Sequence, residues 1–141
     1  TKGVDADLAD RVTKENLDEA AAFAKAFAGK MNAVVAITGA IDIVADAEKA
    51  YCIYNGRPEM SSITGTGCQL SALTAAFVTA NQEQPLEAAA AAVCAMGLSG
   101  ETAYARLGEL DGNATYRNYI IDAIYRMNGE ALEAGAKFEV R

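Results

Sequence analysis

Residues 33–77 read AVVAITGAIDIVADAEKAYCIYNGRPEMSSITGTGCQLSALTAAF and hold the pattern that decides the fold. The run Ala33–Ile37 is short, apolar and closed by Thr38-Gly39, which is typical of a strand covered on both faces. Two further short runs, Ile41–Ala45 and Ala50–Tyr54, are separated by residues 46–49 and closed by Asn55-Gly56. They predict a hairpin at the edge of a sheet.

Helical patterns lie on both sides of these strands. Residues 16–29 predict a helix that begins at Asn16, with Glu19 completing a capping box, and ends at Gly29. After the loop 57–62, the rest of the chain predicts alanine-rich helices over residues 67–80, 86–107 and 115–134. The second of these is apolar on most of its circumference, so we expect it to be buried within the domain or against another subunit. Together the elements indicate an α/β domain with a short central sheet.

The composition excludes several classes of function. The 141 residues carry a net charge of −7 and no cluster of lysine and arginine, so we expect neither nucleic acid nor an anionic membrane as a partner. The longest apolar run, Leu86–Gly100, is shorter than the roughly 20 residues of a membrane span. The absence of histidine excludes imidazole bases and histidine-based metal sites. Three cysteines without CxxC spacing favour a reducing cytoplasm over a disulfide framework or a zinc site.

The stretch Thr64-Gly65-Thr66-Gly67-Cys68 is a glycine-rich turn that leads directly into a helix. Glycine lets the backbone adopt positive φ and approach a ligand closely, and the free amides of a helix's first turn favour an anion. The pattern predicts a phosphate site, although the same turn can simply join a strand tightly to a helix. Cys68 is either a small buried hydrophobe or a thiol facing the anion, where it accepts a substrate proton or holds the acceptor hydroxyl.

Two other groups have competing interpretations. Thr38 either ends its strand or contacts a ligand at the end of that strand. Asp42 and Asp46 could form a paired-carboxylate metal site, but they share the polar face of a strand, and solvation of that face explains them better.

With these motifs in this order, the sequence resembles hydroxyethylthiazole kinases of the ribokinase-like superfamily. That family has a fixed order of motifs: a strand ending in Thr-Gly, a short hairpin, an Asn-Gly loop and a TGTGC or TGAGC turn. The spacing from Thr38 to Cys68 in this sequence matches that order without a gap. Residues 86–100 (LEAAAAAVCAMGLSG) and 120–125 (IIDAIY) also resemble its late helices. The likeness implies that residues 1–141 form the C-terminal part of one ribokinase-like domain with three-layer α/β/α architecture.

The resemblance also implies a function. It points to an ATP- and Mg²⁺-dependent kinase acting on the hydroxyl of 4-methyl-5-(2-hydroxyethyl)thiazole in thiamine biosynthesis or salvage. The turn residues Gly65, Thr66, Gly67 and Cys68 would form an anion hole over the transferred phosphate, and Gly65 would also touch the thiazole alcohol. Thr38 would bind ATP, and Cys68 would be the catalytic residue, where most ribokinase-like enzymes hold an aspartate. A homotrimer with shared active sites is implied, while the metal ligands stay unassigned.

Three positions depart from the family pattern: Ala40 where an acidic residue is frequent, Arg57 where histidine is usual, and Gly112–Tyr116 where Gly-Pro-Gly-Ser-Phe is common. Thr1–Asp5 resembles a mid-chain segment, so we expect the N-terminal half to be cleaved, disordered or supplied on another chain. Two alternative functions stay open. One is a hydroxymethylpyrimidine or pyridoxal-type kinase, which an aspartate at position 68 would have favoured. The other is a non-catalytic α/β assembly module that keeps the phosphate turn.

Overall fold

The computed structural model describes residues 12–141. The prediction that Thr1–Asp5 is a mid-chain segment concerns residues outside this described part. In chain order the elements are α1 (Leu17–Met31), β1 (Val35–Ile37), β2 (Asp42–Ala45), β3 (Ala50–Ile53), the short 3₁₀ helix η2 (Pro58–Ser62), α2 (Thr66–Ala80), α3 (Pro85–Tyr104), α4 (Asn113–Arg126), α5 (Gly129–Gly135) and β4 (Phe138–Val140).

The strands of the described residues form one antiparallel sheet in the order β1-β2-β3-β4. The predicted hairpin is confirmed as β2 and β3, which pair in a register from Asp42 opposite Ile53 to Ala45 opposite Ala50. Its predicted position at the edge is wrong for this sheet, because β1 pairs with β2 and β4 pairs with β3. The sequence pattern did not predict β4, whose 3 residues are too few to show a periodicity.

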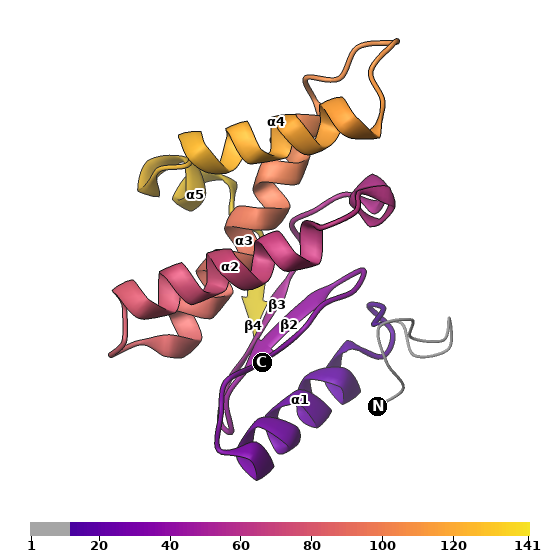
Figure 1. Ribbon diagram of the computed structural model, residues 1–141. Coiled ribbons are helices and arrows are strands. Elements are labelled where there is room, and N and C mark those ends of the chain that lie inside the picture. The colour runs from indigo at the N-terminus through magenta and orange to yellow at the C-terminus, as the bar shows by residue number, and fades with distance from the viewer. Residues whose placement is uncertain (1–11) are drawn as a thin grey trace.

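Helices cover both faces of the sheet, which confirms the three-layer arrangement (Figure 1). On one face, Leu17 and Ala21 of α1 pack in one cluster with Ile43 and other strand residues. On the opposite face, Val44 packs against α3. Neighbouring residues of a strand point to opposite faces, so Ile43 and Val44 belong to different halves of the core.

The strand β1 is less covered than predicted. It is one of the two edge strands of the described sheet, and α3 packs over β2 and β3 rather than over it. As a result Ala36 is exposed, and its neighbours Val35 and Ile37 are only half-buried. The prediction of a strand buried on both faces is therefore wrong for these residues. The burial of a strand depends on which helices pack over it, and the apolar run alone does not determine that.

The helix α3 is buried, as its apolar circumference predicts. It lies between the sheet and the helices α2 and α4, and 13 of its residues are buried. Packing inside this chain therefore accounts for the burial of α3, and no second subunit is needed to explain it. Small residues such as Gly97 and Gly100 let neighbouring segments approach the α3 backbone closely.

Two predicted helix boundaries differ from the structure. The helix α1 runs past Gly29 to Met31, and its C-cap Asn32 adopts the left-handed conformation with φ of 48°. The predicted capping box is also absent, since the side chain of Asn16 accepts a hydrogen bond from the Thr13 amide at 2.7 Å and gives no side-chain cap to α1. At the C-terminal end, Asn32 takes the place that the sequence predicted for a glycine, because asparagine tolerates the left-handed region.

The predicted helix over residues 115–134 is two helices. Met127 is extended with ψ of 133°, which ends α4, and Asn128 caps α5 by accepting a hydrogen bond from the Ala131 amide at 2.8 Å. An asparagine side chain that competes for backbone amides favours such a break. The new start turns the chain so that α5 packs on α3 and leads into β4.

Candidate functional site

The turn Thr64–Cys68 joins the end of η2 to the start of α2. Gly65 has φ of 96°, a left-handed conformation that favours glycine, and it precedes the first helical residue. Ile63, which precedes the turn, is buried with 4% of its surface exposed and packs in a hydrophobic cluster with Met96. The Thr66 hydroxyl donates to the carbonyl of Ile63 at 3.3 Å, which closes the turn. The predicted glycine-rich turn at a helix start is therefore present.

The first amides of α2 are available to a ligand. Among residues 12–141, the carbonyl of Gly65 accepts from the Gln69 amide at 3.0 Å, whereas the amides of Thr66, Gly67 and Cys68 donate to no protein acceptor. Free amides are the normal state of a helix start, and together with the helix dipole they attract negative charge. No acidic residue lies in this first turn to occupy them.

Space around the turn is open. A side chain placed at Gly65 or at Gly67 would meet no atom within 4 Å, so ligand atoms can approach the backbone at both positions. Cys68 is exposed, whereas Cys52 and Cys94 are buried. Of the two interpretations of Cys68, the small buried hydrophobe is therefore wrong in the described structure.

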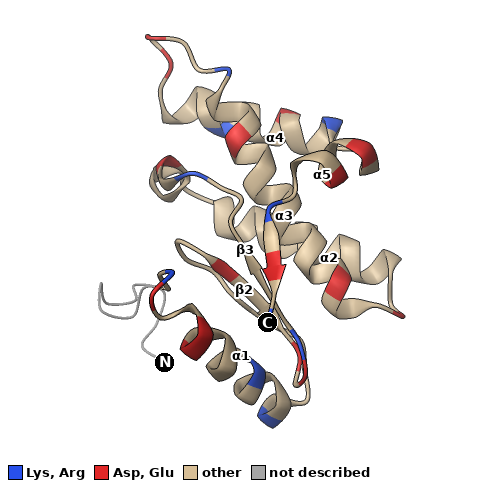
Figure 2. Ribbon diagram, turned by 180° about the vertical axis from the view of Figure 1, so that it is seen from behind, with Lys and Arg blue, Asp and Glu red and all other residues tan. Residues whose placement is uncertain are grey.

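Thr38 lies at the same end of the sheet as this turn. Asp42, the first residue of β2, pairs with Ile53, the last residue of β3, so the β1–β2 connection lies beside the chain that leaves β3 toward η2. Thr38 is exposed in that connection. In Figures 1 and 2 the β1–β2 connection and η2 project toward the same side of the molecule.

Asp42 differs from the solvated carboxylate that the sequence predicted. Its face of the sheet is covered by α3, and burial raises its pKa to about 6 despite the opposing hydrogen bond from the Gly39 amide. Asp46 sits in the turn between β2 and β3, where its carboxylate accepts from the amides of Glu48 and Lys49 at 2.8 and 2.7 Å. The two carboxylates therefore have separate local roles, and each closes a different turn.

Two departures from the family pattern have structural roles close to the turn. The Arg57 guanidinium lies over the ring of Tyr104, 4.0 Å from its centroid, and pairs with Glu59 through two hydrogen bonds. The Asn113 side chain donates to the carbonyl of Ser62 at 3.2 Å. Both residues therefore hold the segment that leads into Thr64–Cys68, a connection that sequence spacing alone did not reveal.

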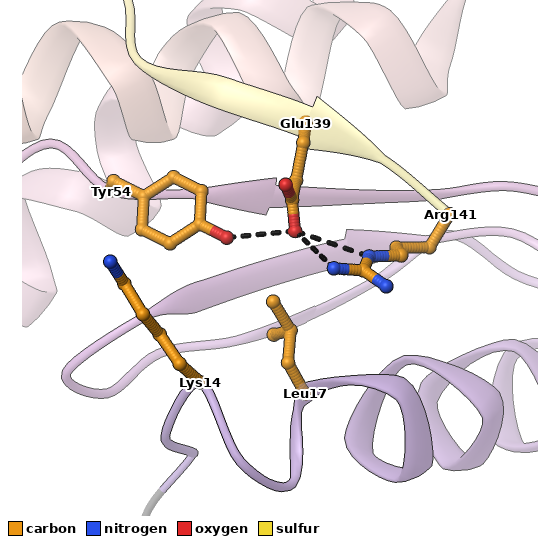
Figure 3. A pocket seen from close by; sticks show the side chains of 5 residues that line it. All are labelled: Lys14, Leu17, Tyr54, Glu139 and Arg141. Carbon is orange, nitrogen blue, oxygen red and sulfur yellow. Dashed lines mark hydrogen bonds and ion pairs between the residues drawn. The ribbon is translucent and has the colours of Figure 1, made fainter.

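A concave region lies away from this turn, near the C-terminal strand. Its lining residues are Lys14, Leu17, Tyr54, Glu139 and Arg141, around about 360 Å³ (Figure 3). Glu139 accepts from the Tyr54 hydroxyl at 2.8 Å and from Arg141 at 2.6 and 3.1 Å, and Arg141 also pairs with Asp18. These partners satisfy one another, and the acidic residue of β4, Glu139, lies between the flanking basic residues Lys137 and Arg141 in the chain. Figure 2 shows this change from basic to acidic to basic along the C-terminal segment. The arrangement favours a stabilising contact between β4 and α1.

Within residues 12–141, each helix is too short or too polar to span a lipid bilayer.

Comparison with known proteins connects this chain to a family. The sequence profile of the hydroxyethylthiazole kinase family matches residues 1–130. A hydroxyethylthiazole kinase of Clostridium acetobutylicum is 57% identical over 99% of this chain and 51% of its own length. The hydroxyethylthiazole kinase 2 of Methanosphaera stadtmanae is 40% identical over 93% of this chain and 46% of its own length.

A solved structure gives the same result for the fold. The hydroxyethylthiazole kinase protein of Pyrococcus horikoshii OT3 superposes with a TM-score of 0.80 and 32% identity, over 90% of this chain and 48% of that chain. The chain therefore spans about half the length of the curated relatives it matches.

Proposed function

This chain belongs to the hydroxyethylthiazole kinase family, and from that premise we propose that it forms part of an enzyme that transfers phosphate from ATP to the hydroxyl of 4-methyl-5-(2-hydroxyethyl)thiazole. The observation that carries the proposal is the turn at Gly65–Cys68, where free first-turn amides meet open space at two glycines. Phosphoryl transfer depends mainly on positioning and on neutralising negative charge, and this turn offers both.

The amides of Thr66, Gly67 and Cys68 would act on the transferred phosphoryl group. Negative charge spreads over its equatorial oxygens during transfer, and fixed donors aimed at that charge need no reorganisation as it develops. Each such donor typically contributes roughly 3–4 kcal/mol in enzymes that use them. The positive φ of Gly65 turns the backbone at the helix start, and its missing side chain leaves room for the alcohol.

We further propose that Cys68 is the catalytic residue. During transfer the alcohol oxygen bonds to the γ-phosphorus, the bond from phosphorus to the ADP oxygen breaks, and the alcohol loses its proton. An exposed sulfur beside the amides can accept that proton as thiolate, or orient the hydroxyl while the proton passes to solvent. Thr38 would contact the ATP phosphates from the neighbouring connection at the same end of the sheet.

ATP in such enzymes is used with Mg²⁺, which neutralises charge on the phosphates. The described residues hold no group of three or more Asp, Glu, Cys or His side chains that could bind a metal ion. We propose that Mg²⁺ arrives with ATP, and its protein ligands stay unassigned.

We also propose the setting in which the reaction occurs. The residues of the unmatched half, on the same or another polypeptide, would complete the thiazole pocket, and a cytoplasmic location would keep Cys68 reduced. A homotrimer is proposed from the family resemblance. The helix α2 carries no charged residue and no buried residue, so its surface could meet another subunit or the unmatched half. Light scattering of the complete enzyme tests the trimer, and a monomeric mass contradicts it.

A chimera tests the function. This chain would replace the matching 51% of the Clostridium acetobutylicum relative, and the unaltered relative would serve as the positive control. With ATP, we expect the chimera to phosphorylate the thiazole alcohol in preference to hydroxymethylpyrimidine and pyridoxal. Mass spectrometry of the products measures this preference. Preference for another alcohol would favour the related kinases. A folded chimera inactive on all three would favour a non-catalytic assembly module.

A further inference from the structure

Glu101 of α3 joins three segments that are distant in the sequence. Its Oε1 accepts from the Gly56 amide at 2.9 Å and from the Asn55 side chain at 3.2 Å, and its Oε2 accepts from Lys137 Nζ at 2.6 Å. Asn55 in turn donates to the Gly135 carbonyl at 3.0 Å and accepts from the Lys137 amide at 2.8 Å. One carboxylate thus ties the end of β3 to α3 and to the start of β4.

The surroundings of Glu101 are enclosed enough for these bonds to matter. Asn55 is 6% exposed and the Glu101 side chain is 19% exposed. Burial would raise the pKa of Glu101, but the hydrogen bonds from Lys137, Gly56 and Asn55 outweigh it and lower the pKa. The carboxylate is therefore charged at neutral pH and pairs with donors on both oxygens.

The backbone near Asn55 cannot move away from α3 without losing close contacts. A side-chain carbon added at Gly97 would lie 2.6 Å from the backbone carbonyl carbon of Asn55, so the two backbones already touch. Gly56 has φ of 121°, a conformation that favours glycine. Glu101 accepts a hydrogen bond from the Gly56 amide. This bond fixes the direction in which the chain leaves β3.

The segment 57–63 continues along the same stretch of α3. Arg57 lies over Tyr104, Met60 packs against Gly100, and Ile63 packs in a cluster that includes Met96. Hydrogen bonds from the Met60 amide to the Arg57 carbonyl and from the Ile63 amide to the Met60 carbonyl keep this segment coiled. The turn Thr64–Cys68 follows at once, so its placement depends on how residues 56–63 are seated on α3.

We propose that Glu101 is a positioning residue for the phosphoryl transfer proposed above: by fixing Gly56 it sets, through residues 57–63, where the amides of Thr66–Cys68 point. This inference rests on the proposed function for its catalytic consequence, but not for its structural one. Glu101 does not touch the turn itself in the structure, and it acts through the intervening backbone.

Variants of Glu101 in the chimera test the inference. Glu101→Ala is expected to lower kcat about 10- to 100-fold with KM for ATP nearly unchanged, because a displacement of about 1 Å is enough to weaken transition-state contacts by that factor. Glu101→Gln keeps an oxygen for Gly56 and Asn55, so it should restore kcat to within about threefold of the parent. If Glu101→Ala fails to fold, Glu101→Asp replaces it, since its shorter side chain cannot reach Gly56.

The matched control is Glu87→Ala on the same helix. Glu87 also accepts from a lysine, Lys49 Nζ at 2.8 Å, and from a neighbouring Tyr51 hydroxyl at 3.3 Å, but it contacts the β2–β3 hairpin. It should affect stability without changing kcat. An equal fall in kcat for Glu87→Ala and Glu101→Ala, or a Glu101→Gln variant as slow as Glu101→Ala, would overturn the positioning role.

Amide hydrogen exchange separates this inference from the proposed function. In Glu101→Ala, peptides covering residues 56–68 should exchange faster than in the parent, while peptides of β2 and α1 should not change. This readout needs no turnover, so it decides the role of Glu101 even if the parent chimera phosphorylates none of the alcohols. Unchanged exchange over residues 56–68 would overturn the inference in an active or an inactive enzyme alike.

Discussion

The amide of Gly39 donates a hydrogen bond to Oδ1 of Asp42 across 2.8 Å, and this contact closes the turn between β1 and β2. The turn carries Thr38, and the carboxylate that holds it faces α3 rather than solvent. Burial against α3 also places Asp42 near the thiol of Cys94, whose pKa is raised to about 11 by its own burial and then by Asp42. The contact thus orders the predicted ATP side of the site at the cost of burying a carboxylate.

The stability of the protein should depend on the protonation of Asp42. Its pKa is raised from 3.8 to about 6, so between these values the folded state keeps a proton that the unfolded state has lost. The contribution of Asp42 to the free energy of unfolding is therefore greatest below pH 3.8 and falls as the pH rises through about 6. Asp42→Asn keeps an acceptor for Gly39 and removes the buried charge.

We expect Asp42→Asn to raise the free energy of unfolding by about 1–3 kcal/mol near pH 7.5 and to change it little near pH 4. Urea denaturation of the chimera at the two pH values measures this. Asp46→Asn is the control with the opposite sign, because hydrogen bonds from the Lys49 and Glu48 amides lower the pKa of Asp46. A loss of stability near pH 7.5 in Asp42→Asn would contradict the prediction.

The two glycines of the turn should respond differently to alanine. Gly65 has φ of 96°, so Gly65→Ala strains the backbone although no atom would clash, and we expect a loss of about 1–2 kcal/mol. Gly67 lies inside α2 with open space around it, so Gly67→Ala should add up to about 1 kcal/mol through helix propensity. Thermal unfolding of both variants in the chimera measures the difference, and equal shifts would show that the φ of Gly65 is not strained by alanine.

Cys68→Ala should lower kcat about 100-fold or more with little change in KM for ATP, because it removes the proposed base or orienting group and leaves the amides in place. Cys68→Asp should be faster than Cys68→Ala, since a carboxylate can also accept the proton. Steady-state kinetics of the chimera with the thiazole alcohol measures both. Unchanged turnover in Cys68→Ala would remove this residue from the mechanism.

Thr38→Ala should raise KM for ATP about 10-fold and change kcat less, because one hydroxyl contact to the nucleotide phosphates contributes about 1.5 kcal/mol. Thr38→Ser keeps the hydroxyl and should behave like the parent. Titration of ATP at saturating alcohol gives both constants. Identical ATP affinity in Thr38→Ala and the parent would leave Thr38 as a residue that only ends its strand.

The spacing of nearby residues was sufficient to predict those elements that depend mainly on contacts between residues close in the sequence. The β2–β3 hairpin followed from two short apolar runs around a polar turn, and the Thr64–Cys68 turn followed from two glycines before a helix. The helix α3 was predicted to be buried because apolar residues occupy most of its circumference. The order of these motifs was also enough to indicate the family.

Tertiary structure decided the features that depend on distant partners. The three residues of β4 form a strand only because β3 offers an open edge, about 85 residues earlier in the chain, and so short a segment has no periodicity of its own. Asp42 has the spacing of a solvated strand residue, but α3 covers its face and changes its pKa. Likewise Glu101 is one of two charged residues on an apolar helix until folding brings Gly56 and Lys137 to its two oxygens. Hydrogen bonds and burial of this kind depend on which segments meet in space, which the spacing of residues along the chain does not contain.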